Sequence, residues 1–462
     1  MATLKFGNNS LLTLTSRITT PSIHIQKDGD HWYVPLFSGS KGAVVQSGDY
    51  NYTLGGLKVG SYRAAIGREE VVVDVVDIYV FSSGNTTWIL TSKGDLYGCG
   101  YNIYGQQGSG GTNKVKTFTK RAENVKEVSC SRDTTWYIDT SNNLYGCGCA
   151  DLGQQGSEDT DNVKTFTKRA ENVKEVSCSQ NTTWYIDNNN NLYGCGANYN
   201  GQQGSGTSED TDNVFTFTKR AENVKKVICT INTTWYINNN NNLYGCGYNG
   251  KGQQGSGNTS DVLTFTKRAE NVKEVSCTDN TTWYIDTSNN LYCCGDNYNY
   301  QQGTGNTSNV LTFTKRAENV KEVSCSQNTT WYIDNNNNLY GCGRSNFGQQ
   351  GTGDTIAVKT FTKRAENVKE VSCTAYTTWY IDNNNNLYGC GRSNFGQQGS
   401  GNTSDVLTFT KRAENVKEVS CTNDITRYID NNNNLYGCGW NSDGQQGSGD
   451  TSNVLTFTKR EL

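Results

Sequence analysis

The sequence predicts an all-β protein whose larger part, residues 71–462, is a β-propeller of eight four-stranded blades. One unit recurs eight times, with copies 48 residues apart, as from Trp88 to Trp136, and once 51, from Trp184 to Trp235. Each unit divides into four short stretches rich in Val, Thr, Tyr and Trp, separated by clusters of Asn, Asp, Gly and Ser. Fifty glycines and only two prolines suit many tight turns. Because four strands in roughly 40 to 50 residues make one propeller blade, eight units predict eight blades, with seven as the alternative.

Each unit contains V-K-E-V-S-C, T-T-W-Y-I-D, L-Y-G-C-G and F-T-K-R, or close variants, which we interpret as the four strands of an antiparallel meander. Because both faces of a blade pack against neighbouring blades, Trp184 should be buried on one side and Tyr185 on the other. The run D-N-N-N-N at 187–191 is then a hairpin turn, and pairs such as Lys168-Arg169 should form a solvated ring. The tryptophan of T-T-W occurs at Trp88, Trp136, Trp184, Trp235, Trp283, Trp331 and Trp379, with Arg427 in the eighth copy.

Residues 91–108 read TSKGDLYGCGYNIYGQQG, and the later units keep this order of turn, strand and loop. The order resembles the repeat of the regulator of chromosome condensation, in which a V-x-x-V-x-x-G strand, a Y-x-W-G strand and a G-x-N-x-x-G-Q-L-G loop recur. The resemblance implies a propeller fold. The loop asparagine of that family is matched at Asn102, Asn198, Asn249, Asn297 and Asn441.

The unit also departs from the family pattern. Cysteine replaces the family's tryptophan before glycine, as at Cys99, Cys195 and Cys342, glutamine replaces the leucine of G-Q-L-G, and the histidine after the first strand is absent. The best-known family member exchanges nucleotide on a small GTPase and binds chromatin, and other members grip proteins, such as a bacterial inhibitor of β-lactamase. Because a fold does not fix a function, the resemblance implies a binding protein without naming its partner.

Charge and hydropathy exclude several classes of partner. The net charge is -3, and Lys and Arg recur at fixed intervals without forming a basic stripe, so we expect no nucleic-acid partner. Only 34% of residues are hydrophobic and no 18 of them run together, so we expect no membrane insertion. The N-terminus lacks a cationic start before an apolar core, so we expect no signal peptide.

We expect neither catalysis nor a cofactor. The only histidines, His24 and His31, precede the repeats, and no Ser-His-Asp set breaks the repeat. A metal site is not expected, because the repeats lack histidine and C-x-x-C, and the D-N-N-N-N turn lacks the Gly and Glu of a calcium loop. Seven cysteine pairs such as Cys130 and Cys147 lie 17 residues apart. On the first and third strands of a blade their backbones would be roughly 9 to 10 Å apart, too far for a disulfide, so the thiols should be reduced.

Comparison of the eight copies separates the connections into two groups. The D-N-N-N-N turn and the K-R-A-E-N connection hardly change, whereas three stretches vary: the one after the first-strand cysteine and the two that flank G-Q-Q-G. In a meander all three lie at the same end of the blade. Their Tyr, Asn, Ser, Asp, Arg, Trp and Phe are the residue types of antibody loops, which favours a binding face, and drift after recent duplication is the alternative. The ligand-binding residues predicted there are Tyr101, Tyr104, Arg132, Tyr199, Tyr248, Tyr298, Arg344, Phe347, Tyr376, Arg392, Phe395 and Trp440.

Residues 1–70 should form a separate, small β module. The stretch 21–37 alternates on both sides of an Asp-Gly and predicts a β-hairpin, and the stretch 51–66 predicts a second. So small a module has little core of its own. We expect it to join the chain to a larger assembly, as N-terminal segments of phage tail and bacterial surface proteins do.

These observations lead to three hypotheses of function. The leading one is a non-enzymatic phage tail-associated or receptor-binding protein, which presents the variable face to a cell-surface protein or glycan. Such a protein would be found in the virion or outside the cell after cytoplasmic assembly. The second is a cytoplasmic regulator or inhibitor that binds one protein partner, and the third is a structural decoration protein without a ligand.

Overall fold

The structure is a computed structural model, and it describes residues 3–7, 11–16, 23–27, 30–34, 50–54, 60–66, 69–207 and 213–461. Within these residues every regular element is a strand and no helix occurs. The chain divides into two compact units, one made mainly of Met1–Tyr79 and the other of the residues from Val80 onward. The expected division into 1–70 and 71–462 stays a prediction.

The first unit contains two antiparallel sheets. One has the order β1-β2-β5 and the other the order β4-β3-β6-β7. Strands β3 and β4 form the hairpin expected within 21–37, with Lys27 opposite Asp30. The bounds of the strands in the two sheets are β1 Thr3–Gly7, β2 Leu11–Ser16, β3 Ile23–Lys27, β4 Asp30–Val34, β5 Tyr50–Leu54, β6 Gly60–Ile66 and β7 Glu69–Val75.

The prediction of a second hairpin within 51–66 is wrong. Strand β5 pairs with β2, whereas β6 lies between β3 and β7 in the other sheet. An edge strand offers its free N–H and C=O groups to any nearby strand, so closeness in sequence did not decide the pairing.

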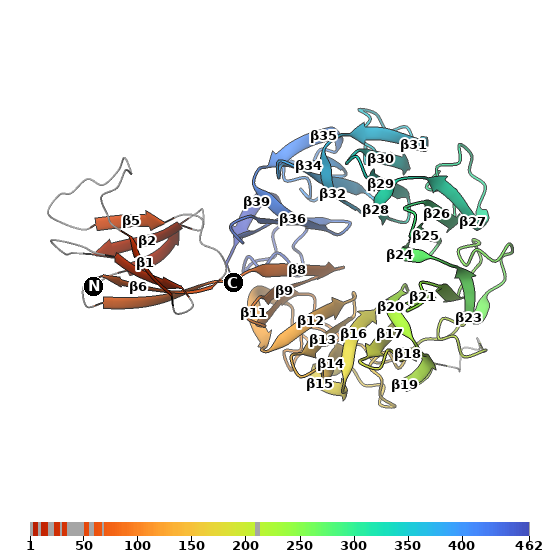
Figure 1. Ribbon diagram of the computed structural model, residues 1–462, viewed down its shortest axis with the longest axis horizontal. Coiled ribbons are helices and arrows are strands. Elements are labelled where there is room, and N and C mark those ends of the chain that lie inside the picture. Colours follow the sequence, from red (N-terminus) through yellow and green to blue (C-terminus); the bar gives the residue numbers. More distant parts are fainter. Residues whose placement is uncertain are drawn as a thin grey trace. The chain divides into compact units, whose positions relative to one another are not determined.

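The second unit is the predicted propeller. Eight four-stranded antiparallel sheets, each made of consecutive strands of one repeat, form a ring with the first strand of each blade nearest the centre (Figure 1). Eight blades are confirmed, and the seven-bladed alternative is excluded.

The strand bounds repeat almost unchanged around the ring. Blade 1 contains β8 Ile78–Ser83, β9 Thr86–Thr91, β10 Leu96–Gly100 and β11 Val115–Ala122; blade 2, β12 Val125–Cys130, β13 Thr134–Asp139, β14 Leu144–Gly148 and β15 Val163–Ala170. Blade 3 contains β16 Val173–Cys178, β17 Thr182–Asp187, β18 Leu192–Gly196 and β19 Val214–Ala221; blade 4, β20 Val224–Cys229, β21 Thr233–Asn238, β22 Leu243–Gly247 and β23 Val262–Ala269. Blade 5 contains β24 Val272–Cys277, β25 Thr281–Asp286, β26 Leu291–Gly295 and β27 Val310–Ala317; blade 6, β28 Val320–Cys325, β29 Thr329–Asp334, β30 Leu339–Gly343 and β31 Val358–Ala365. Blade 7 contains β32 Val368–Cys373, β33 Thr377–Asp382, β34 Leu387–Gly391 and β35 Val406–Ala413; blade 8, β36 Val416–Cys421, β37 Ile425–Asp430, β38 Leu435–Gly439 and β39 Val454–Arg460.

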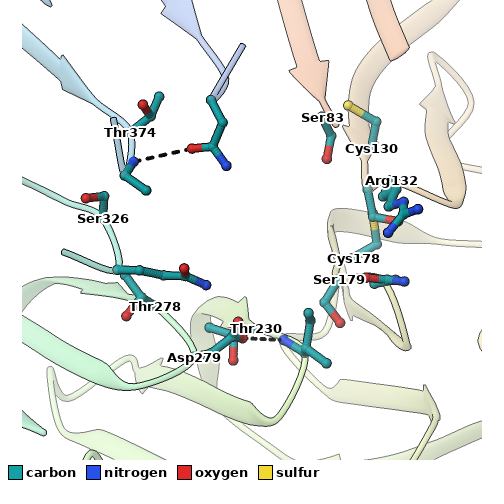
Figure 2. Close-up of a pocket in the computed structure, with 16 residues that line it drawn as sticks. Ser83, Cys130, Arg132, Cys178, Ser179, Thr230, Thr278, Asp279, Ser326 and Thr374 are labelled. Atoms are coloured by element: carbon teal, nitrogen blue, oxygen red, sulfur yellow. Dashed lines mark hydrogen bonds between the residues drawn. The ribbon is translucent and has the colours of Figure 1, made fainter. Parts of the chain in front are cut away.

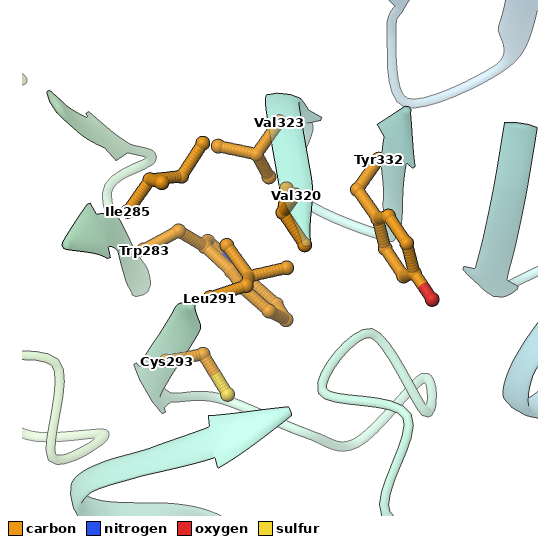
Figure 3. Packing of buried hydrophobic residues seen from close by; sticks show 7 residues of the cluster. All are labelled: Trp283, Ile285, Leu291, Cys293, Val320, Val323 and Tyr332. Carbon is orange, nitrogen blue, oxygen red and sulfur yellow. The ribbon is translucent and has the colours of Figure 1, made fainter. Parts of the chain in front are cut away.

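The core consists of one apolar layer between each pair of neighbouring blades. Figure 3 shows such a layer between blades 5 and 6. Its centre is Trp283, which is fully buried and meets Phe361 of the next blade edge-on, with ring centroids 6.0 Å apart. In the same way Trp184 packs toward blade 4 and Tyr185 toward blade 2, so the predicted two-sided burial of the second strand is confirmed.

A glycine on the third strand makes room for six of the seven indoles. A Cβ on Gly341 would lie 2.4 Å from the ring of Trp331, closer than real contacts allow. Blade 5 is the exception: Cys293 stands at this position beside Trp283, and Arg316 Nε donates a hydrogen bond of 3.0 Å to its sulfur. The close approach of the indole explains the glycine in the other six blades.

The cysteine of L-Y-G-C-G, which is the second cysteine of L-Y-C-C-G in blade 5, connects each blade to the one before it. In blade 2 the Cys147 thiol donates to the main-chain oxygen of Gln106 at 3.4 Å, and in blade 1 Cys99 reaches Gln445 of blade 8 at 3.5 Å. The same bond occurs at every junction, including the one between blades 8 and 1. The ring therefore closes although each blade contains only the strands of its own repeat. None of the 17 cysteines forms a disulfide in the structure, and their reduced state stays a prediction. The other pairs are Cys195–Gln154, Cys246–Gln202, Cys294–Gln253, Cys342–Gln301, Cys390–Gln349 and Cys438–Gln397.

Arg427, which replaces the tryptophan in blade 8, lies at the junction of the last and first blades. Its guanidinium donates to Ser82 Oγ at 3.0 Å and to the main-chain oxygen of Gln445 at 2.6 Å. Burial lowers the pKa of Arg427 to about 10. The bond to Ser82 joins blade 8 to blade 1, and the bond to Gln445 holds the guanidinium within blade 8.

We call the side with the second-to-third turns and the blade-to-blade connections the turn end. The asparagine run at 187–191 is a hairpin turn there, as predicted. Asp187 Oδ1 accepts from the main-chain N–H of Asn189 and Asn191, and Asn190 adopts a φ of 62°. The main-chain oxygen of Asn190 then accepts from Val224 of the next blade at 2.9 Å. The turn thus fixes its own shape and holds the following blade.

The prediction of a solvated ring of Lys-Arg pairs is only half correct. Lys363 is exposed and pairs with Glu366 at 2.6 Å, as expected. Arg364 next to it is half-buried, its Nε has no hydrogen-bond partner, and burial lowers its pKa. Neighbouring side chains on a strand point to opposite faces, so only the lysines face solvent.

Candidate functional site

We call the opposite side, with the first-to-second turns and the third-to-fourth loops, the loop end. Beneath its variable residues lies a constant, buried frame. In blade 4 the Asn249 side chain accepts from the Gln254 main chain at 2.8 Å and donates to Ser256 Oγ and to the main-chain oxygens of Asn258 and Ser260. Asn249 is fully buried. The other matched loop asparagines are also fully buried, so they shape the loop from beneath its surface.

The glutamines of G-Q-Q-G connect this frame to the next blade. Gln253 Oε1 accepts from the main chain of Lys251, and its Nε2 donates to the main-chain oxygen of Asp279 in the first turn of blade 5 at 2.9 Å. Gln254 Nε2 donates to the main-chain oxygen of Cys246. The first glutamine makes this bond in six of the eight blades and there holds the variable loop against the first turn of the following blade. In blade 2 Gln154 donates to Asp151 of its own loop, and in blade 8 the Nε2 of Gln445 has no hydrogen-bond partner.

Five of the predicted ligand-binding residues lie together in blades 6 to 8, and we call them the aromatic–arginine cluster: Phe347, Tyr376, Arg392, Phe395 and Trp440. The Arg392 guanidinium lies 5.4, 5.0 and 5.7 Å from the ring centroids of Phe347, Tyr376 and Phe395. Phe347 meets Tyr376 edge-on at 5.5 Å, and Phe395 stacks on Trp440 at 5.7 Å. These side chains are half-buried, so their packing fixes them while part of each remains accessible.

The other predicted aromatic residues do not join this cluster. Tyr101 and Tyr104 form a separate pair in blade 1, with centroids 6.5 Å apart. Tyr199 accepts a hydrogen bond from Asn181 at 2.7 Å. Tyr248 lies over Gly250, and Tyr298 is 75% exposed.

The two remaining predicted residues, Arg132 and Arg344, have weak partners. Arg132 lies 3.7 Å from Asp133 Oδ1 and is 60% exposed. The side-chain oxygen of Asn346, when it faces Arg344, accepts from two guanidinium nitrogens: Nε at 3.1 Å and one terminal nitrogen at 2.9 Å. Neither the sequence nor the structure assigns a ligand to any of the twelve residues, so their binding role stays a prediction.

A polar cavity of about 450 Å³ opens at the centre of the loop end (Figure 2). First turns of successive blades line it, with hydroxyl groups such as those of Ser179, Thr230 and Thr278. The turns bond to one another, because Asp279 accepts from the main chain of Ile231 at 3.2 Å, and Asn423 from that of Ala375. The cavity is therefore a rigid, largely uncharged centre of the face.

A second cavity of about 350 Å³, which we call the seam pocket, lies where blade 8 meets blade 1. Gly84 and Asn85 form the first turn of blade 1, which has one residue fewer than the turn at 131–133 in blade 2. Arg132 lies against Gly84, where a Cβ would come within 3.3 Å of its Cγ. The lining residues are Gly84, Asn85, Arg132, Thr422, Asn423, Asp424 and Trp440.

Two carboxylates flank this pocket and the adjoining turn: Asp424, which is half-buried, and Asp133, which is buried. Burial raises the pKa of Asp424, an effect that Arg392 opposes from 3.8 Å. Burial likewise raises the pKa of Asp133, and Arg132 opposes it. Sequence reasoning missed Asp424 and Gly84; the one signal for the pocket was the shortened first turn of blade 1.

The described part of the chain offers no evident metal centre, since no three His, Cys, Asp or Glu residues gather there in a way that could hold an ion. Nor does that part contain a helix with the length and hydropathy needed to span a membrane. The buried thiols are weak acids, because burial raises the pKa of third-strand cysteines such as Cys147.

The fold and the two ends define a repeat β-propeller with a uniform turn end and a variable loop end. The model of the regulator of chromosome condensation (RCC1) repeat matches residues 272–301, which run from the first strand of blade 5 into its loop. The chain is an RCC1-like repeat β-propeller. A sequence comparison with curated proteins found no match.

Solved structures share this fold at low sequence identity. Human WBSCR16 is 14% identical with a TM-score of 0.57, and the match covers 71% of this chain and 96% of that one. A chain from the structure of Kap60 bound to yeast RCC1 (Prp20) is 16% identical with a TM-score of 0.55, covering 75% and 87%. Prp20p from Saccharomyces cerevisiae, described with its binding to Gsp1p and histones, is 14% identical with a TM-score of 0.55, covering 83% and 88%. At such identities the likeness shows the fold alone.

Proposed function

We propose that the propeller is a non-catalytic module that binds a protein partner through its loop end. One observation carries this proposal: the aromatic–arginine cluster, which packs across three blades at the variable end. Trp, Tyr and Arg are the residues that most often dominate the binding energy of protein interfaces. A rigid frame beneath them lowers the entropy that binding loses.

The relatives favour a protein as the partner. Kap60 is bound to yeast RCC1, and Prp20p binds Gsp1p and histones, as their descriptions state. Of the three hypotheses from sequence, the regulator or inhibitor that binds a protein agrees best with these relatives. The comparisons give no support to the phage-tail hypothesis or to a glycan ligand. Placement in the cytoplasm stays part of the proposal.

A loop-exchange variant tests the proposal. The segments 344–347, 392–395 and 440–443 are replaced by Tyr-Asn-Gly-Lys, as at 248–251, and 374–376 by Thr-Ile-Asn, as at 230–232. The substituted sequences come from blade 4, so the loops keep a frame that this chain already folds.

The wild type, the loop-exchange variant and a turn-end control, Lys168→Gln with Lys363→Gln, are compared as baits in an extract of the native cell. Partners identified by quantitative mass spectrometry are then purified and titrated by calorimetry. We expect a partner whose affinity falls at least roughly tenfold in the loop-exchange variant and stays within about twofold in the turn-end control. Loss in the turn-end control with retention in the loop-exchange variant would contradict the proposal.

A further inference from the structure

The outer strand of a blade is covered along its first half by the third-to-fourth loop of the blade before it, and blade 3 is the exception. In the other seven blades the glycine two residues after G-Q-Q-G donates its main-chain N–H to the second residue of the next outer strand, as Gly206 does to Leu263 at 2.9 Å. In five of them the preceding Ser or Thr also forms a β-bridge, as Ser205 does with Thr264. The other six bonds, each 2.8 or 2.9 Å long, are Gly110–Lys164, Gly257–Leu311, Gly305–Lys359, Gly353–Leu407, Gly401–Leu455 and Gly449–Lys116.

The loop of blade 2 lacks this glycine and does not make the bond. The seven glycines adopt φ between 81° and 93°, a left-handed region that other residues rarely enter. Blade 2 carries Glu158 at this position, and Glu158 is not among the residues with a positive φ. Among the described residues, the main-chain oxygen of Phe215, the second residue of β19, therefore accepts no hydrogen bond from the loop before it.

The first half of β19 is thus an uncovered strand edge, which we call the open edge: Val214 to Phe217. Strand β19 is the outermost strand of blade 3 (Figure 1). The loop of blade 2 still lies directly beside it, since a Cβ on Gly153 would come within 2.8 Å of the Phe215 Cα. Thr216 is exposed. A strand edge with unpaired main-chain groups is a template for another extended chain.

The loop that borders the open edge carries three exposed carboxylates: Glu158, Asp159 and Asp161. Because Glu158 occupies the place of the covering glycine, a negative charge stands where the other blades have a neutral main chain. The described residues give none of the three an ion pair, whereas Glu171 of the same blade is paired with Lys168 at 2.5 Å. The open edge therefore combines a free main-chain acceptor with unpaired negative charge.

We propose that the open edge docks an extended, basic segment of a partner protein, which adds as a further strand to blade 3. A main-chain N–H of the segment donates to the Phe215 oxygen, as the covering glycines do in the other seven blades. Lysines or arginines at alternate positions of the segment face the carboxylates of the blade 2 loop, because alternate side chains of a strand lie on the same face. This surface belongs to blades 2 and 3, so it is separate from the aromatic–arginine cluster of blades 6 to 8.

Charge distinguishes this segment from other strands that could pair there. Two copies of the chain joined through β19 would bring two sets of three carboxylates together, and like charges at an interface oppose binding. An acidic segment would meet the same repulsion, and a neutral one would leave the carboxylates unpaired. The covering loops of the other blades show that an extended main chain fits at this position.

The test uses the full chain and ten-residue peptides in which Lys or Arg alternates with Thr or Val. Matched peptides carry Gln or Glu in place of the basic residues. We expect the basic peptides to bind at least roughly tenfold more tightly than the Gln peptides, through several exposed ion pairs that added salt should weaken. N-methylation at alternate positions should abolish binding in one of the two alternating sets and spare the other, because only every second N–H of a strand points toward a given neighbour.

Glu158→Gly and Glu158→Gln form a matched pair of variants. Both remove the same charge, but only glycine readily adopts the positive φ that covers the edge. Glu158→Gly should weaken the best basic peptide by at least roughly tenfold, whereas Glu158→Gln should weaken it by about threefold or less. Hydrogen exchange should show a newly protected amide at residue 158 in the glycine variant alone.

Two further variants complete the set. Replacing residues 158–162 by Gly-Gly-Thr-Asn-Lys, as at 110–114 of blade 1, installs a covering loop of equal length that this chain already folds, and it should abolish binding. This replacement takes the place of Glu158→Gly in the comparison if the single glycine gains no protection. Asp354→Asn, at an exposed carboxylate in the loop of blade 6, is the control and should bind within about twofold. Thermal melting checks that each variant is folded.

Equal losses in the glycine and glutamine variants would overturn the inference, because binding would then depend on charge and not on the open edge. A preference for Glu peptides, binding that neither N-methylated set weakens, or no peptide binding below about 1 mM would overturn it as well. Dimerisation of the chain that Glu158→Gly removes would assign the open edge to a second copy and also contradict the inference. The loop-exchange variant leaves blades 2 and 3 unchanged, so this inference and the proposed function can fail independently.

Discussion

The turn end and the loop end of the propeller differ in what holds their connections. At the turn end, Asp187 fixes the hairpin and Asn190 bonds to the next blade, so these polar groups have structural tasks. At the loop end, Asn249 and the G-Q-Q-G glutamines perform these tasks from buried positions. The residues above them are free to vary. Constancy at the turn end therefore needs no ligand to explain it, and variation at the loop end does not disturb the fold.

The difference changes how the sequence should be interpreted. The comparison of the copies assigns binding to the loop end only if the constant turns could have drifted as well. The structure shows that they could not, because Asn190 needs a positive φ and its oxygen holds Val224. The stronger reason to assign binding to the loop end is the cluster around Arg392, which connects three blades.

The largest effect is expected from breaking a turn. In blade 6 the buried Asp334 accepts from the main chain of Asn336 and Asn338 and from the Asn338 side chain. Asp334→Ala leaves these donors without their acceptor and should lower the free energy of unfolding by about 3 kcal/mol. Urea unfolding measures the change. Asn336→Ser keeps the main-chain bond and should stay within about 0.5 kcal/mol; equal losses in the two variants would show that the turn is not held by Asp334.

A smaller effect, dependent on pH, is expected on the inner strands near the turn end. Burial, together with Glu418 and Glu322, raises the pKa of Glu370 from 4.5 to about 7. Folding therefore favours the neutral carboxyl group: its contribution to stability is complete below pH 4.5 and is lost as the pH rises through about 7. Glu370→Gln should raise the free energy of unfolding by about 2 kcal/mol at pH 8 relative to wild type, less than the full shift implies because the group is partly solvated.

Melting curves of this variant at pH 8 and at pH 4 measure that prediction. The gain should shrink or disappear at pH 4, where both forms are neutral. A gain of the same size at both values would mean that packing, and not the titration of Glu370, produces it. Lys168→Gln, at an exposed pair of the same end, is the control and should show no such pH dependence.

Next in size is a change to the buried frame of the loop end. Asn249→Ser introduces the residue that blades 6 and 7 carry at Ser345 and Ser393, where the hydroxyl accepts from the following glutamine at 3.4 Å. The change removes the amide donors and should lower the free energy of unfolding by roughly 1 to 2 kcal/mol. Hydrogen exchange should show the loss in the loop of blade 4. An unchanged stability would mean that the frame is not what holds the loops.

The smallest effect is expected from the exposed residues above that frame. Tyr298 is 75% exposed, and Tyr298→Ala should change the free energy of unfolding by less than about 0.5 kcal/mol. Urea unfolding beside Asp334→Ala compares the two ends directly. A loss of more than about 1 kcal/mol would remove the distinction between them.

Most of the propeller could be predicted from the sequence because each strand carries its own signal. Buried tryptophans such as Trp331, the glycine beside six of the seven indoles and the Asp-Asn turn recur at nearly fixed spacing, so one repeat explains most of the ring. The inward direction of Arg364 was not predicted, since Lys363 and Arg364 have the same charge and only the strand separates them. The pairing of β5 was missed because neighbouring strands in sequence chose different sheets.

The site was predicted less completely because its geometry depends on contacts between blades. Variation among the copies identified Phe347, Arg392 and Trp440 separately. Their side chains come together because the loops of blades 6 to 8 lie beside one another in the folded ring. The seam pocket depends on Gly84, whose turn lost a residue, and on Asp424, which belongs to another blade. Neither residue is unusual by itself, so only the closed ring brings them together.

Site-specific photocrosslinking tests most directly the claim that binding belongs to the loop end. Asn394 and Asn383 are exposed residues at the loop end and the turn end of the same blade, and each is replaced in turn by benzoylphenylalanine. With the partner present, we predict that the probe at Asn394 forms a crosslink that Arg392→Gln weakens, and that the probe at Asn383 forms none. A crosslink from Asn383 alone would contradict the account, because it would place the partner on the uniform end.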